Sequence, residues 1–223
     1  MAGLIRRAGF AALIVAAAYA LQLANMFYFE PRMGFATVGD FFDTAKLQPA
    51  LTSTAWQLNA WGQLLAGFAF IFLGQVVAQL VRERRPVGAG LTAVAGGLCG
   101  GTTMLVAILS GPGALLPGAF AAANPGNDAA FVGTLVIVNY AVTTLGAILL
   151  GWFIVQLGWA LRKRTRVPYL FTLFGLITGL ANLNLFRSQA YYPLCYILVF
   201  LWAVALAFVL FTRAQQLAEP PED

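Results

Sequence analysis

The sequence predicts an all-α fold: a polytopic membrane helix bundle of six transmembrane helices with both termini in the cytoplasm. Three observations lead to this prediction. Of the 223 residues, 61% are hydrophobic and 9% are charged, whereas a soluble domain carries about 25% charged residues. The apolar residues form six stretches of roughly 20 residues or more, which is the length that crosses a bilayer. Lys and Arg concentrate in alternate loops, as the positive-inside rule requires.

Each predicted span is bounded by residues that do not continue an apolar helix. The first follows Arg6 and Arg7; it also fits a secretory signal peptide, but we expect it to be retained as an uncleaved signal anchor. The second ends at the charged run 82–85 and the third at the Gly-Pro-Gly turn 111–113. Basic residues at 162–166 separate the fourth from the fifth, and a proline opens the sixth. The spans cover about residues 8–29, 55–81, 87–110, 131–161, 167–186 and 191–211 of a single domain, 1–223.

The basic residues predict the orientation. Two precede the first span, three follow the second, four follow the fourth and one lies in the tail 212–223, so ten of the 13 fall on one side. The other side holds Arg32, Lys46 and Arg187. Lys and Arg are enriched in cytoplasmic loops, so the sequence predicts cytoplasmic termini and a cytoplasmic tail. The same asymmetry accounts for the net charge of +5 without a nucleic-acid partner.

Residues 30–54 form the first outer loop. They mix apolar side chains such as Phe35 and Phe41 with the charged Asp40 and Lys46. This mixture fits a short amphipathic helix that lies along the outer membrane surface. It fits equally well an ordered loop that caps the bundle.

The composition argues against several classes of function. His is absent, which removes imidazole metal sites, haem ligation by His and His-based proton relays. The two cysteines, Cys99 and Cys195, lie far apart and without metal-ligand spacing. No Asp, Glu, Lys or Arg falls in the middle of a predicted span, which argues against ion-coupled transport. We therefore expect no catalytic residues, no metal and no cofactor.

Neutral polar residues gather at one depth, near the outer ends of four predicted spans, and Arg187 directly follows the fifth span. An unpartnered amide in hydrocarbon costs several kcal/mol, so these groups should face one another or a wet cavity. The functional interpretation is a pocket that binds a polar head group; the alternative is interhelical hydrogen bonding alone. The candidate ligand-binding residues are Gln22, Asn25, Gln57, Asn59, Gln63, Asn139, Tyr140, Asn182, Asn184 and Arg187.

Glycines at four-residue spacing mark two of the predicted spans. Small residues at this spacing let helix backbones approach closely in lipid. We expect them to serve packing within the chain, with oligomerisation or partner docking as the alternative. The candidate packing residues are Gly96, Gly97, Gly100, Gly101, Gly175 and Gly179.

The fourth and fifth spans carry a resemblance. The run 145–152, LGAILLGW, a basic turn, Pro168 and the run 174–180, FGLITGL, resemble a large family of small six-span bacterial integral membrane proteins of unknown function. The resemblance implies a multi-pass protein of the bacterial inner (cytoplasmic) membrane. That family has no assigned activity, so it implies no active site.

Two functions fit these observations. The first is a non-catalytic accessory or scaffold subunit of a larger membrane complex, surrounded by membrane lipids and joined to a membrane-protein partner or to further copies of itself. The second is a binder or facilitator of a lipophilic small molecule, such as a lipid, quinone, carotenoid or other pigment. The glycine faces and uncharged spans favour the first function, and the outer polar cluster favours the second.

Overall fold

The computed structural model describes residues 1–83, 85–115, 128–164, 169–183 and 192–218. Helices account for almost all of these residues, and none of them lies in a strand. The prediction of an all-α protein is therefore confirmed. The predicted site residues Asn184 and Arg187 lie outside the described residues.

Six long helices carry the fold, and shorter elements occupy the outer loop and the C-terminal end. The long helices are α1 (Ala2–Ala24), α4 (Thr54–Val81), α5 (Pro86–Ser110), α7 (Asp128–Arg164), α8 (Tyr169–Leu183) and α9 (Tyr192–Thr212). The short elements are the π-helical η1 (Asn25–Phe29), α2 (Glu30–Arg32), the 3-10 helix η2 (Val38–Phe42), α3 (Thr44–Leu51), the 3-10 helix η3 (Pro112–Leu115) and α10 (Ala214–Ala218).

Five helical segments among the described residues are long and apolar enough to cross a membrane: Ala2–Arg32, Thr54–Val81, Pro86–Ser110, Ala130–Arg162 and Pro193–Thr212. The protein is thus a membrane-embedded helical bundle. Helix α8 has 15 described residues, about 22 Å at 1.5 Å per residue, which is shorter than a hydrocarbon core of about 30 Å. The sixth span and the cytoplasmic orientation of the termini stay predictions.

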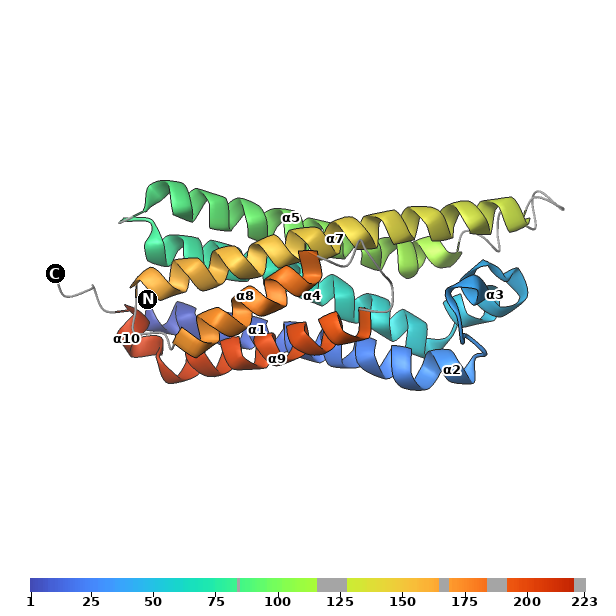
Figure 1. Ribbon diagram of the computed structural model, residues 1–223, viewed down its shortest axis with the longest axis horizontal. Coiled ribbons are helices and arrows are strands. Elements are labelled where there is room, and N and C mark those ends of the chain that lie inside the picture. Colours follow the sequence, from blue (N-terminus) through green and yellow to red (C-terminus); the bar gives the residue numbers. More distant parts are fainter. Residues whose placement is uncertain (84, 116–127, 165–168, 184–191, 219–223) are drawn as a thin grey trace.

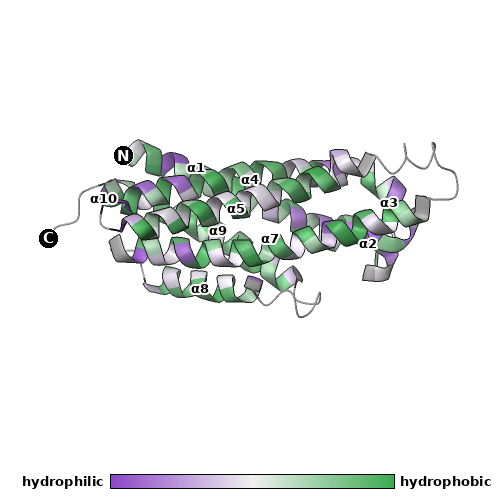
Figure 2. Cartoon of the chain, turned by 90° about the horizontal axis from the view of Figure 1, so that it is seen from above, coloured by the Kyte–Doolittle hydropathy of each residue, from purple (hydrophilic) through white to green (hydrophobic). Residues whose placement is uncertain are grey.

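The long helices form a ring in which each packs against the next: α1, α4, α5, α7, α8 and α9, which returns to α1. The N-terminus and α10 lie at one end of the bundle, whereas α2 and α3 lie at the other (Figure 1). We call these the terminal end and the cap end. Hydrophobic residues dominate the helices between the two ends (Figure 2), as a lipid environment requires.

The core occupies the bundle from its middle to the terminal end. Its largest fully buried side chains include Trp202, Phe70 and Phe153. Phe70 and Phe153 meet edge to face, with ring centroids 5.7 Å apart. Such interlocking aromatic and aliphatic side chains gain dispersion energy, which association in lipid depends on.

Helices α4 and α5 approach most closely at glycines. A Cβ added to Gly96 would lie 2.8 Å from the Cα atom of Gly74, and one added to Gly100 would lie 2.4 Å from the carbonyl oxygen of Gly67. No side chain fits in these gaps. Gly67 and Gly74, which contact these α5 glycines from α4, were not among the packing residues predicted from the sequence.

The other predicted packing glycines divide into two groups. A Cβ on Gly179 would lie 2.8 Å from the carbonyl oxygen of Gly151 in α7, and one on Gly175 would lie 3.3 Å from the Nε1 atom of Trp202. Gly97 and Gly101 have no atom within 4 Å of an added Cβ. Each follows a packed glycine by one residue, so it lies about 100° around the helix and faces away from α4.

Residues 30–54, which we call the cap, fold onto the end of the bundle. Phe35 stacks on Phe41 with ring centroids 4.7 Å apart. Phe35 and Leu47 are buried in a small cluster with Val132 of α7. The loop does contain a helix, α3, but its apolar side chains pack on the protein, which favours the capping interpretation.

Candidate functional site

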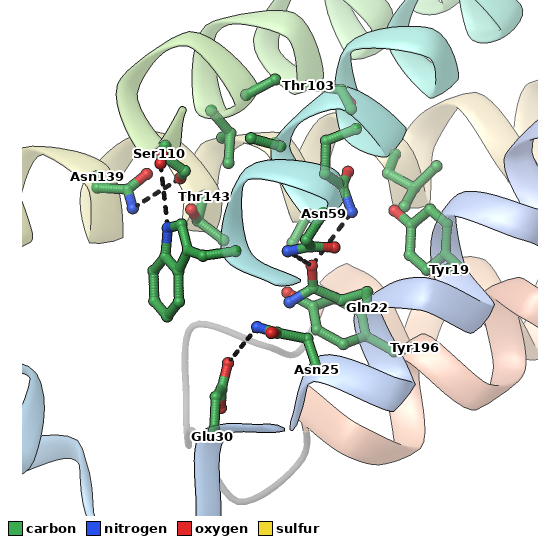
Figure 3. A pocket seen from close by; sticks show the side chains of 18 of the residues that line it. Tyr19, Gln22, Asn25, Glu30, Asn59, Thr103, Ser110, Asn139, Thr143 and Tyr196 are labelled. Atoms are coloured by element: carbon green, nitrogen blue, oxygen red, sulfur yellow. Dashed lines mark hydrogen bonds between the residues drawn. The ribbon is translucent and has the colours of Figure 1, made fainter. Parts of the chain in front are cut away.

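A cavity of about 180 Å³ lies among the helices beside the cap (Figure 3). Its walls come from α1, η1, α2, α4, α5, α7, α8 and α9. Polar lining residues are Tyr19, Gln22, Asn25, Glu30, Trp56, Asn59, Gln63, Thr103, Ser110, Asn139, Thr143, Asn182 and Tyr196. The remaining lining residues are Ala60, Val106, Ala107, Gly146, Ala147 and Leu150.

The antiparallel course of the chain brings the carboxamides together. Gln22 lies near the end of α1, and Asn59 and Gln63 lie near the start of α4, so both groups face the cap end. Asn59 and Gln63 are one helical turn apart and share a face. The Nδ2 atom of Asn59 donates to Oε1 of Gln22 at 2.6 Å, and Nε2 of Gln63 donates to the same oxygen at 3.4 Å.

A π-helical segment shapes the α1 side of the cavity. Asn25 begins this segment and is 2% exposed. Its Nδ2 atom donates to Oε1 of Glu30 at 2.9 Å (Figure 3). An ionised carboxylate only accepts hydrogen bonds, so the amide nitrogen must face it. The π-helix therefore places an acidic group on the cavity wall, and π-helical turns are frequent at functional sites.

Helices α4, α5 and α7 are joined at Ser110. The Nδ2 atom of Asn139 donates to the Ser110 hydroxyl at 3.2 Å, and the indole Nε1 of Trp56 donates to the Ser110 carbonyl at 3.0 Å. Trp56 also packs near Phe35 and Phe41, with ring centroids 6.4 Å from each. One side chain thus connects the cavity wall to the cap.

Three carboxamide oxygens in the cavity lining have no hydrogen-bond partner. They are the Oδ1 atoms of Asn25, Asn59 and Asn139, all of which are buried. In each residue the amide nitrogen is already bonded within the protein. A buried unpartnered carbonyl costs about 1–3 kcal/mol. The three oxygens belong to lining residues of three different helical segments, η1, α4 and α7.

Six of the ten predicted ligand-binding residues line this cavity: Gln22, Asn25, Asn59, Gln63, Asn139 and Asn182. The sixth, Asn182, donates to the carbonyl of Thr178 in its own helix at 2.8 Å. Two do not line it. Gln57 donates instead to the Leu51 carbonyl at 2.7 Å and so closes the cap onto α4, and Tyr140 is 43% exposed.

The sequence analysis missed Glu30, Ser110 and Thr143. Glu30 was assigned to the outer loop, because nothing in the sequence indicates that the helix continues through a π-helical turn. Ser110 and Thr143 are small hydroxyl residues of a kind common in membrane helices. No pattern distinguishes them before the helix faces are known.

The lining offers hydrogen-bonding groups and one carboxyl group, that of Glu30. No group of three or more His, Cys, Asp or Glu residues in the described part of the chain could hold a metal ion. Cys99 and Cys195 are both buried as free thiols, and neither lines the cavity.

Comparisons with protein-family models, with curated proteins and with solved structures find no match to this chain. The resemblance to a bacterial six-span family therefore stays a hypothesis.

Proposed function

We propose that this protein binds a small polar molecule, or the polar head group of a lipophilic one, in the cavity at the cap end. The observation that carries the proposal is the set of unpartnered oxygens on Asn25, Asn59 and Asn139. A ligand that donates hydrogen bonds would satisfy these oxygens. Val106, Ala107 and Leu150 in the lining would contact an apolar part of the same molecule.

Helix packing alone explains these amides less well. Side chains that serve to join membrane helices gain about 1 kcal/mol or less from each hydrogen bond. An amide that makes one such bond and leaves its buried oxygen empty loses more than it gains. A ligand removes this deficit, which is why we favour binding over a purely structural role.

A mass measurement tests the proposal. Native mass spectrometry of the protein, gently released from its own membranes, should show a tightly held small molecule. Replacing Asn25, Asn59 and Asn139 together with Leu should remove that mass. Gln75→Leu is the matched control, because Gln75 is an exposed amide on α4 outside the cavity. Equal retention of the small molecule by the triple variant and the control would exclude this cavity as the site.

A second candidate role, as an accessory or scaffold subunit, rests on α7. Of its most apolar 18-residue stretch, 6% is buried, compared with 61% for α4. Lipid or a partner helix would cover this surface. In the same mass measurement, a stoichiometric partner protein without a bound small molecule would favour the subunit role.

A further inference from the structure

We infer that the head group taken by this cavity is a cation with N–H donors, an ammonium or a guanidinium, and that Glu30 is its counter-charge. The inference rests on the proposed function and specifies the class of ligand. It follows from two properties of the lining: which hydrogen-bonding atoms remain free, and which charge is present.

Three acceptors of the lining have no partner, whereas the donors on the same side chains and on Trp56 are bonded to the protein. The amide nitrogens of Asn25, Asn59 and Asn139 all donate to protein oxygens, and so does the indole nitrogen of Trp56. The three asparagine oxygens remain empty. A ligand rich in acceptors, such as a phosphate or carboxylate, would meet like groups at these three positions. A ligand with several N–H groups would fill the vacant positions.

The charge in the lining is negative. Glu30 is the one charged residue in the described lining, and its Oε1 atom accepts a hydrogen bond from Asn25. Arg32 is the cation nearest to Glu30 in the sequence. Its guanidinium group lies over the Tyr28 ring, with the guanidinium carbon 3.3 Å from the ring centroid. Within the described residues Glu30 forms no ion pair. Glu30 is partly buried; a carboxylate withdrawn from water is costly unless it is paired, and a bound cation would pair it.

Four probes, each built on a six-carbon chain, separate charge from donor capacity. They are n-hexylammonium, hexyltrimethylammonium, 1,2-hexanediol and hexanoate, each titrated against the full chain in lipid nanodiscs by calorimetry. We expect n-hexylammonium to bind most tightly. Hexyltrimethylammonium keeps the charge without N–H donors and should bind more weakly; hexanediol keeps donors without charge and should also bind more weakly. Hexanoate should not bind, because Glu30 would repel it.

A charge-neutral variant identifies the counter-ion. Glu30→Gln should weaken n-hexylammonium binding by on the order of tenfold or more, the value of a charge-assisted hydrogen bond. Its affinity for hexanediol should not change. Asp43→Asn is the control, because it removes a charge from the cap, keeps a residue suited to an N-cap and lies outside the cavity. This variant should bind all four probes as the wild type does.

The outcomes separate the two proposals. If hexanediol binds the wild type as tightly as n-hexylammonium, or if Glu30→Gln leaves both unchanged, the cavity has no preference for cations. The inference then fails while the proposed binding function stands. Preferred binding of hexanoate, or no binding of any probe to the wild type, also overturns the inference. The wild-type series decides the matter even if Glu30→Gln does not fold.

Discussion

The two halves of the bundle use the same helices for different purposes. Toward the terminal end, α4 and α7 interlock through Phe70 and Phe153, and every large core side chain is apolar. Toward the cap end, the same two helices present Asn59 and Asn139 to a cavity. Hydropathy, which is high along both helices, therefore does not distinguish a packed segment from a binding segment.

A substitution should affect the stability of the protein differently in the two halves, for a physical reason. In the terminal half, core side chains such as Phe70 and Phe153 are fully buried, so removing one leaves a void. In the cap half, space already exists and three acceptor oxygens are already unpartnered. Stability should therefore reside in the terminal half and binding in the cap half.

The largest effect should come from truncating the terminal core. Phe153→Ala should destabilise the protein by about 3–5 kcal/mol, because it leaves a cavity beside Phe70. Unfolding by denaturing detergent in mixed micelles measures the change. Leu145→Ala on the same helix is the control: Leu145 is 51% exposed, so the loss should be small. Equal losses for the two variants would mean that this half is not the stability centre.

A smaller effect should separate two adjacent glycines. Gly100→Ala places a methyl group against the Gly67 carbonyl and should cost about 1–3 kcal/mol through overpacking. Gly101→Ala meets no atom within 4 Å and should be neutral or slightly stabilising. Thermal unfolding in detergent compares the pair. Loss of stability in Gly101→Ala alone would place the helix contact on the opposite face of α5.

Substitution in the cap half should change stability still less. Asn59→Leu removes one hydrogen bond to Gln22 and one unpartnered oxygen, so the net change should be within about 1 kcal/mol. The same variant should lose affinity for the bound molecule. A loss of stability as large as that of Phe153→Ala would show that Asn59 serves packing, and the contrast between the halves would fail.

The smallest effect should be confined to the cap. Asp40 accepts hydrogen bonds from the Lys46 ammonium and from the backbone N–H groups of Thr37 and Ala36. The Lys46 bond is the largest cause that lowers the pKa of Asp40 below its ordinary value of 3.8, and the same bond raises the pKa of Lys46.

Because its pKa is lower in the folded cap, Asp40 stabilises the cap fully above pH 3.8 and progressively less as pH falls further. Amide hydrogen exchange across residues 33–51 should therefore be faster at pH 3 than at pH 6, after correction for intrinsic rates. In Asp40→Asn it should be fast at both pH values. A wild-type cap that exchanges equally slowly at both would contradict this role of Asp40.

The fold class and much of the candidate site could be predicted, because both depend on position along a helix. Gln22, Asn59 and Asn139 lie at similar depths on antiparallel helices, so counting residues from each helix end brings them together. The depth of a residue along a helix does not determine which side of the helix it lies on. Gln57 precedes Asn59 by two residues, about 200° around the helix, and it joins the cap instead of lining the cavity.

Glu30 shows a second limit of the sequence. Its place in the cavity lining depends on five π-helical residues, Asn25–Phe29, which change how the helix continues beyond Ala24. A π-helical turn has no residue pattern comparable to a cap or a proline kink. An acidic residue that was counted in the outer loop therefore contributes to the candidate binding surface.

The hydrogen bonds of the cavity also bear on how the chain is inserted into the membrane. Asn59 bonds to Gln22 across α4 and α1, and Asn139 bonds to Ser110 across α7 and α5. Within the described residues each pair joins two consecutive long helices, and Asn25 bonds to a residue five positions later. Each hairpin can thus satisfy its own amide N–H groups as it leaves the insertion machinery, before the last helix is synthesised. The asparagine side chains that carry the unpartnered oxygens are therefore oriented by bonds within consecutive helices, and α9 adds Tyr196 to the lining.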